Sequence, residues 1–117
     1  MEKHTLIKLL MICNLGISTS FVKDHIVNAF SEKGMELDFK AQPRSDLEQL
    51  IDNVDMVLIA PQISYLKDEV FEICEAHHKK CLVIPFSLYG NMDGEGIAAL
   101  IEEAIAQDNN TFENKEK

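Results

Sequence analysis

Cys13 stands at a point of the sequence that favours chemistry on an anion. The apolar run before it, residues 6–12, predicts a buried strand, and a helical pattern starts after Ser18, Thr19 and Ser20. A thiol at a strand–loop–helix junction faces the unpaired amides of a helix N-terminus, which carry a partial positive charge. That field suits a phosphate, and it also lowers a thiol's pKa and so makes the thiol a better nucleophile. We therefore predict that Cys13 attacks or carries a phosphoryl group.

The predicted phosphate-binding loop runs from the cysteine into the first turn of the helix. Backbone amides would surround three phosphate oxygens, Gly16 would let the backbone approach closely, and the hydroxyl residues would add donors. The residues of this loop are Asn14, Leu15, Gly16, Ile17, Ser18, Thr19 and Ser20. The alternative is that Cys13 is a small buried residue without chemistry, because free cysteine is among the most buried residue types.

Composition excludes several classes of function. The 117 residues, 46% of them hydrophobic, suffice for one domain with a real core. The net charge of −9 argues against binding nucleic acid or an anionic membrane surface. The apolar runs are too short to insert into a membrane, and no signal peptide is visible, so we expect a cytoplasmic protein.

The three cysteines do not have the spacing of a metal site or of a redox pair. Cys13, Cys74 and Cys81 include no C-x-x-C motif, and an odd number of cysteines fits a reducing compartment. We expect neither a metal nor a cofactor. Cys74 and Cys81 have apolar neighbours and are predicted to lie in the core.

Hydrophobic periodicity divides the chain into alternating strands and helices. Gly34 is expected to end the first helix in a left-handed conformation, and Ser45 with Glu48 is typical of a capping box that opens the second. Residues 87–96 are rich in turn residues and are predicted to form a loop. The predicted strands cover residues 6–12, 36–41, 54–60 and 81–84, and the helices follow at about 18–33, 45–51, 63–77 and 97–105.

This alternation predicts an α/β fold in a single domain, residues 1–107, followed by a flexible polar tail, residues 108–117. Strands that alternate with helices form a parallel sheet with helices on both faces. The expected strand order is 2-1-3-4, a flavodoxin-like arrangement, whose switch point lies between the first and third strands. Ligands bind at such a point, beyond the carboxyl ends of the strands. Cys13 and the Pro61–Gln62 loop would flank that crevice.

The loop is similar to the C-x5-R-[ST] loop of low-molecular-weight tyrosine phosphatases, which have a similar architecture. Thr19, however, stands where their arginine should be. Without a guanidinium to stabilise charge on the phosphate oxygens, hydrolysis would be slow. Asp93 is the one candidate for a general acid. This profile suits a phosphoryl carrier better than a hydrolase.

Three segments together give the chain a closer resemblance. Residues 13–20, 60–65 and 87–94 resemble, in order and spacing, the enzyme IIB component of the lactose/cellobiose/chitobiose class of the bacterial phosphoenolpyruvate-dependent sugar phosphotransferase system (the IIB type-3 domain). The resemblance implies that Cys13 takes a phosphoryl group from a histidine of a IIA protein. Phospho-Cys13 would pass that group to a sugar held by the membrane permease IIC, beside which this cytoplasmic component would work.

The resemblance also implies that two further loops border the phosphate site, and it leaves two other functions open. The bordering residues are Pro61, Gln62, Tyr65, Tyr89, Gly90 and Asp93. The two tyrosines are expected on a rim that docks partners, although partial burial of Tyr65 is an equal alternative. The other functions are a phosphatase-like cysteine hydrolase and a non-catalytic flavodoxin-like binding module in which Cys13 is merely buried.

Overall fold

The computed structural model of the protein describes residues 6–14 and 17–106. The predicted tail, Leu15, Gly16 and the side chains of Ile17 and Ser18 lie outside the described residues. Four parallel strands form one sheet with the order β2-β1-β3-β4, which confirms the predicted topology. The strands are β1 (Leu6–Ile12), β2 (Glu36–Gln42), β3 (Met56–Ile59) and β4 (Lys80–Val83).

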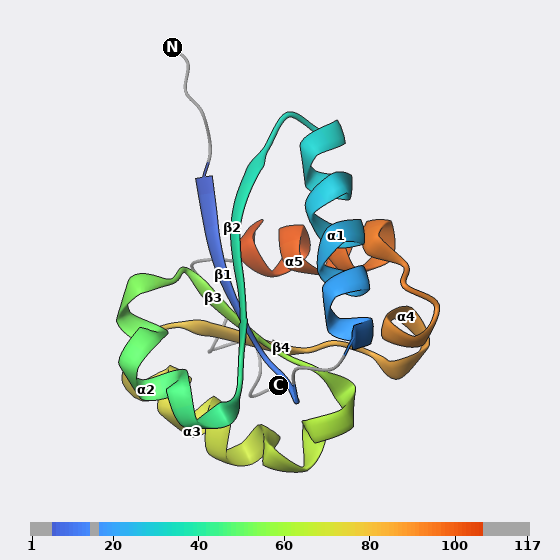
Figure 1. Ribbon diagram of the computed structural model, residues 1–117. Helices are drawn as coiled ribbons and strands as arrows, with labels where there is room; N and C mark the ends of the chain where they lie inside the picture. The colour runs from blue at the N-terminus through green and yellow to red at the C-terminus, as the bar shows by residue number, and fades with distance from the viewer. Residues whose placement is uncertain (1–5, 15–16, 107–117) are drawn as a thin grey trace.

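Helices cover both faces of the sheet, as Figure 1 shows. Helices α1 (Ile17–Glu32) and α5 (Gly94–Ala106) lie against one face, and α2 (Leu47–Leu50) and α3 (Lys67–Ala76) lie against the other. The short helix α4 (Phe86–Gly90) follows β4. Three 3-10 turns complete the connections: η1 (Arg44–Asp46), η2 (Ile51–Asn53) and η3 (Pro61–Leu66).

Strand β1 is the centre of the core because both of its faces are buried. Leu9, Met11 and then Cys13 pack into the cluster under α1 and α5, whereas Leu10 and Ile12 pack into the cluster under α2 and α3. This is the consequence of a side-chain period of two in a strand that is covered on both sides. The apolar run before Cys13, interrupted by Lys8, therefore corresponds to a central strand that ends just before the cysteine.

The predicted loop at residues 87–96 is wrong at both ends, because residues 87–90 belong to α4 and residues 94–96 belong to α5. Pro85 precedes the helix with φ −62°, and its carbonyl oxygen accepts hydrogen bonds from the backbone N–H groups of Leu88 and Tyr89. Residues 91–93 connect the two helices, and Met92 there has a positive φ of 53°. Helix α5 consequently begins at Gly94, three residues before the predicted start at Ile97.

The predicted capping box of Ser45 and Glu48 is also wrong. Ser45 lies inside η1, and no side chain caps η1 or α2. The 3-10 turn begins directly after Pro43, whose extended backbone ends β2, so the chain turns one residue earlier than the serine. Glu48 instead pairs with Arg44. The prediction for Gly34 is confirmed, since its φ is +78°.

The predicted helix over residues 63–77 consists of two parts. Residues Pro61–Leu66 form the 3-10 turn η3, in which Ile63 departs from helical geometry, and the α-helix α3 begins at Lys67. Pro61 occupies the first position of this turn, where its missing N–H group leaves no donor unpaired. The turn brings Gln62 and Tyr65 close behind the end of β3.

Candidate functional site

The backbone of Cys13 lies between the carboxyl ends of two neighbouring strands. Its N–H group donates to the carbonyl oxygen of Gln42 at the end of β2, at 3.0 Å. The preceding carbonyl, of Ile12, accepts the N–H group of Ala60 just after β3, also at 3.0 Å. Cys13 therefore sits at the point where the connections from β1 and β3 diverge, which is the expected ligand position in such a sheet.

The cysteine side chain is buried in the cluster under α1 and α5, where it is only 2% exposed. Helix α1 begins at Ile17, four residues after the cysteine, so the amino end of the helix lies close to it in sequence. Asn14 is exposed at the start of the loop, and Ser20 is exposed on the first turns of α1. The structure thus describes the Cys13 side chain and three side chains of the predicted loop. Cys13 and Thr19 are buried, whereas Asn14 and Ser20 are exposed.

Thr19 and Tyr89 form a buried pair of hydroxyl groups, and Tyr89 packs in the same cluster as Cys13. Their oxygens share a hydrogen bond of 3.2 Å, and the two residues are 6% and 4% exposed. The prediction that Tyr89 lies on an exposed rim is therefore wrong. The phenol ring packs inward because α4 turns it toward α1, and its hydroxyl finds the partner that a buried polar group requires.

Asp93, the candidate general acid, has a structural contact at the start of α5. Its Oδ1 accepts a hydrogen bond of 2.9 Å from the backbone N–H of Gly96, the third residue of the helix. This contact is typical of an N-cap. A side chain at Gly96 would collide with the Asp93 carboxyl group and with Leu88, so the glycine permits the close approach.

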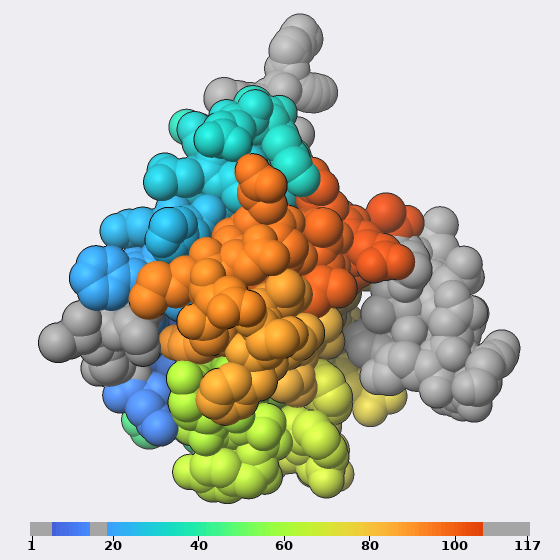
Figure 2. Space-filling model, turned by 90° about the vertical axis from the view of Figure 1, so that its right-hand side faces the viewer, coloured from blue at the N-terminus to red at the C-terminus, as the bar shows by residue number. Residues whose placement is uncertain are grey.

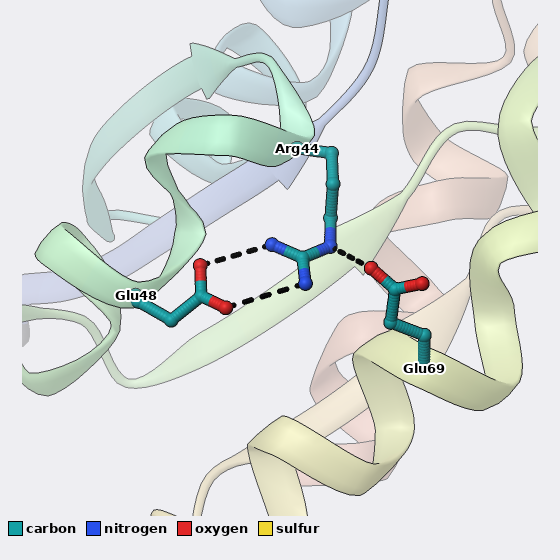
Figure 3. A network of polar contacts seen from close by, with 3 residues as sticks. All are labelled: Arg44, Glu48 and Glu69. Carbon is teal, nitrogen blue, oxygen red and sulfur yellow. Dashed lines mark hydrogen bonds and ion pairs between the residues drawn. The ribbon is translucent and has the colours of Figure 1, made fainter.

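Arg44 is the one arginine of the sequence, and two carboxylates hold it. Figure 3 shows its guanidinium group between Glu48 on α2 and Glu69 on α3. The two terminal nitrogens donate to Glu48 at 2.9 and 3.2 Å, and Nε donates to Glu69 at 2.5 Å. The hydrogen bond to Glu48 raises the pKa of Arg44 above its ordinary value, and the same bond lowers the pKa of Glu48. The guanidinium group is thus paired with two carboxylates.

The predicted bordering residues differ in their accessibility. Pro61 is buried, while Gln62 and Gly90 are exposed and Tyr65 is 79% exposed, which rules out its partial burial. Their elements, η3 and α4, contact each other. In Figure 2, η3 (yellow-green), α4 (orange) and the beginning of α1 (blue) appear on the same face of the molecule.

An open cavity of about 450 Å³ lies between the first turns of α1 and the end of β2. Thr19, Ser20 and Lys23 line it from the helix, and Gln42 lines it from the strand. Because Gln42 is bonded to Cys13, this cavity adjoins the candidate site. Lys23 was not predicted as a site residue, although it lies one turn after Thr19 in the helix that the sequence predicts.

Residues 6–14 and 17–106 contain neither a group of metal ligands nor a helix that could span a membrane. No group of three or more histidine, cysteine, aspartate or glutamate residues is placed to hold a metal ion there. In the same part of the chain, no helix has the length and apolar character needed to cross a membrane.

The fold and the site define a single parallel α/β domain with a cysteine at the switch point of its sheet. The chain belongs to the lactose/cellobiose-specific IIB subunit family of the phosphotransferase system, whose sequence model matches residues 8–100. It is therefore a IIB component of the sugar phosphotransferase system, a phosphoryl carrier that works with IIA and IIC components.

Curated relatives and a solved structure agree with this assignment. The galactose-specific EIIB component of Lactococcus lactis subsp. cremoris (strain MG1363) is 26% identical over 100 residues, which cover 81% of this chain and 93% of the relative. The oligo-beta-mannoside-specific EIIB component of Bacillus subtilis (strain 168) is 30% identical over 88 residues, or 75% and 85% of the two chains. The solution structure of the cellobiose-specific IIB component protein from Borrelia burgdorferi has a TM-score of 0.71 and 28% identity, and the match covers 91% and 94% of the two chains.

Proposed function

We propose that Cys13 carries the phosphoryl group of this IIB component. The observation that carries the proposal is the position of Cys13, where the connections after β1 and β3 diverge. Its N–H group is bonded to Gln42, and α1 begins four residues later. In the first step the Cys13 thiolate attacks the phosphorus of a phosphohistidine on a IIA protein. A phosphorus–sulfur bond forms, the phosphorus–nitrogen bond breaks, and the imidazole leaves.

In the second step a sugar hydroxyl bound by IIC attacks phospho-Cys13. A phosphorus–oxygen bond forms to the sugar, its proton passes to a base, and the cysteine leaves as a thiolate. Amides of residues 14–20 would neutralise the phosphate oxygens in both steps, as the amino end of a helix does for bound anions. Ser20 and Lys23 line the cavity beside Gln42, and in this proposal they would add a hydroxyl donor and a cation.

The carrier function is favoured over hydrolysis by the side chains around the cysteine. Thr19 occupies the position of a phosphatase arginine, and its hydroxyl is bonded to Tyr89. Arg44, the one guanidinium group of the chain, is bonded to two carboxylates. Asp93 is bonded to the start of α5 and is a poor general acid in this position. A phosphocysteine without these groups would survive long enough to be passed on.

The partner surface is proposed to be the face that carries η3, α4 and the beginning of α1. Tyr65, Phe86 and Phe21 come from these three elements and are 79%, 65% and 51% exposed. Exposed aromatic side chains near one site are typical of protein–protein interfaces. We propose that IIA and IIC dock here in turn, with the domain in the cytoplasm beside the membrane permease.

The sugar is proposed to be a β-glycoside or disaccharide of the cellobiose, chitobiose or lactose type. The relatives are named for galactose, oligo-beta-mannoside and cellobiose, so specificity varies within the family. The test is sugar phosphorylation by the reconstituted system, with IIC in membrane vesicles and each sugar in turn. Wild type should form one sugar phosphate and Cys13→Ser none. Release of inorganic phosphate in place of a sugar phosphate would contradict the carrier function and favour the hydrolase.

A further inference from the structure

Cys74 and Cys81 form a pair of thiols away from the candidate phosphoryl site. Cys74 lies in the last turns of α3 and is buried, and Cys81 lies in β4 and is partly exposed. Both pack in the cluster between the sheet and the helices α2 and α3. The Cys81 side chain makes a hydrogen bond with the Cys74 thiol, and this bond lowers the pKa of Cys74 against the opposing effect of burial.

The turn between α3 and β4 holds the two cysteines next to each other. The carbonyl oxygen of Cys74 accepts the N–H groups of His77 and Lys79, at 3.1 and 2.8 Å. His78 has a positive φ of 60°, which reverses the chain at the end of the helix. Strand β4 then begins at Lys80 and contacts α3, so the chain brings Cys81 back toward the helix that carries Cys74. A hydrogen-bonded turn thus joins the two elements that carry the cysteines, and these elements contact each other.

Cys13 is too distant to take part in this pair. Cys81 is opposite Val57 on β3, and Val57 is opposite Leu10 on β1. Cys13 follows Leu10 by three residues, roughly 10 Å along the strand, and two strand spacings add about 10 Å across the sheet. Cys13 also packs on the other face of the sheet. A separation of roughly 14 Å exceeds the limit of about 7 Å between the α-carbons of a disulfide.

We propose that Cys74 and Cys81 are a second reactive site, a dithiol that a peroxide converts to a disulfide independently of Cys13. The partly exposed Cys81 meets the peroxide first: its sulfur takes one oxygen atom to give a sulfenic acid, and water is released. The Cys74 thiolate then attacks that sulfur, the disulfide bond forms, and hydroxide leaves and takes up the proton lost by Cys74. Two thiols are oxidised by two electrons, and one peroxide is reduced to two water molecules.

The test is to treat the full chain with hydrogen peroxide, to block the remaining thiols under denaturing conditions, and to measure intact mass and a peptide map. The expected product lacks two hydrogen atoms, links the peptides of Cys74 and Cys81, and carries one blocking group, on Cys13. Dithiothreitol should reverse it. Cys13→Ser should form the same bridge at the same rate, whereas Cys74→Ser and Cys81→Ser should form none.

Several results would overturn the proposal. A wild-type protein in which Cys81 proceeds to sulfinic acid with Cys74 still free would show that the thiols cannot join. A bridge to Cys13, or a disulfide between two chains, would place the reactive pair elsewhere. Because wild type is itself the positive sample, a serine variant that folds poorly does not affect the conclusion. The result is also independent of phosphoryl transfer, so it stands or fails separately from the proposed function.

Discussion

The hydroxyl oxygens of Thr19 and Tyr89 lie 3.2 Å apart in a buried hydrogen bond that joins the first turn of α1 to α4. The two residues are seventy positions apart in the sequence, and Tyr89 packs in the same buried cluster as Cys13. The bond fixes the start of the helix that follows the cysteine. It also gives a hydrogen-bond partner to the Thr19 hydroxyl group, which stands where a phosphatase has its arginine.

Tyr89→Phe should lower the free energy of unfolding by about 1–2 kcal/mol, because the Thr19 hydroxyl would remain buried without its partner. Chemical denaturation measures this loss. Tyr65→Phe is the matched control, since the Tyr65 side chain is exposed, and it should leave stability unchanged within a few tenths of a kcal/mol. Equal stabilities for the two variants would contradict a structural role for the bond.

Much of the fold follows from the sequence because its signals are strong. The run before Cys13 is apolar on both strand faces, which predicts a central parallel strand, and the alternation of elements leaves few topologies. Helix α4 was missed because its five residues are framed by turn residues and end at Gly90. A helix this short has no periodicity to detect, and Pro85 starts it through a backbone contact.

The candidate site was predicted less completely than the fold. The position of Cys13 follows from the end of the apolar run, and the structure places it at the switch point. The burial of Tyr89 could not be predicted, because it depends on how α4 turns the ring toward Thr19, seventy residues away in sequence. The pairing of Arg44 with Glu69 likewise depends on tertiary contact between two helical segments.

Gly94→Ala should lower the free energy of unfolding by about 2–3 kcal/mol, because the added methyl group would overlap the backbone carbonyl of His25 on α1. Backbone atoms cannot move aside as a flexible side chain can. Gly90→Ala is the control, since its methyl group would meet only the Phe86 ring at 3.9 Å. Thermal or chemical unfolding distinguishes the two, and a tolerated Gly94→Ala would show that α1 and α5 are not in such close contact.

Glu48→Gln should destabilise the protein at neutral pH but not at acidic pH. The hydrogen bond from Arg44 lowers the pKa of Glu48, so the folded state releases the proton more readily than the unfolded state does. The resulting stability is present above about pH 4.5, the ordinary value, and is lost as the pH falls through the lower folded value.

The measurement is the difference in melting temperature between wild type and Glu48→Gln from pH 7 to pH 3. The difference should shrink toward the acidic end. Glu72→Gln, at an exposed position on α3, controls for the loss of one surface carboxylate. If the difference in melting temperature instead grows as the pH falls, the ionised Glu48 carboxylate does not stabilise the fold through Arg44.

Phe86→Ser should weaken docking of the phosphoryl donor without loss of folding, because the side chain is 65% exposed. We expect the concentration of IIA needed for half-maximal transfer to rise about tenfold, as for an aromatic interface residue. Leu6→Ser is the matched control: Leu6 is 49% exposed, but it lies at the opposite end of the sheet. Equal effects of both changes would exclude the proposed docking face.

The central claim is that Cys13 carries the phosphoryl group. The most direct measurement is the intact mass of the protein after incubation with phosphoenolpyruvate, the two general phosphotransferase proteins and a cognate IIA. One added phosphoryl group is expected, mapped to Cys13 and absent from a folded Cys13→Ser variant. A phosphoryl group on another residue, or its retention by Cys13→Ser, would contradict the account.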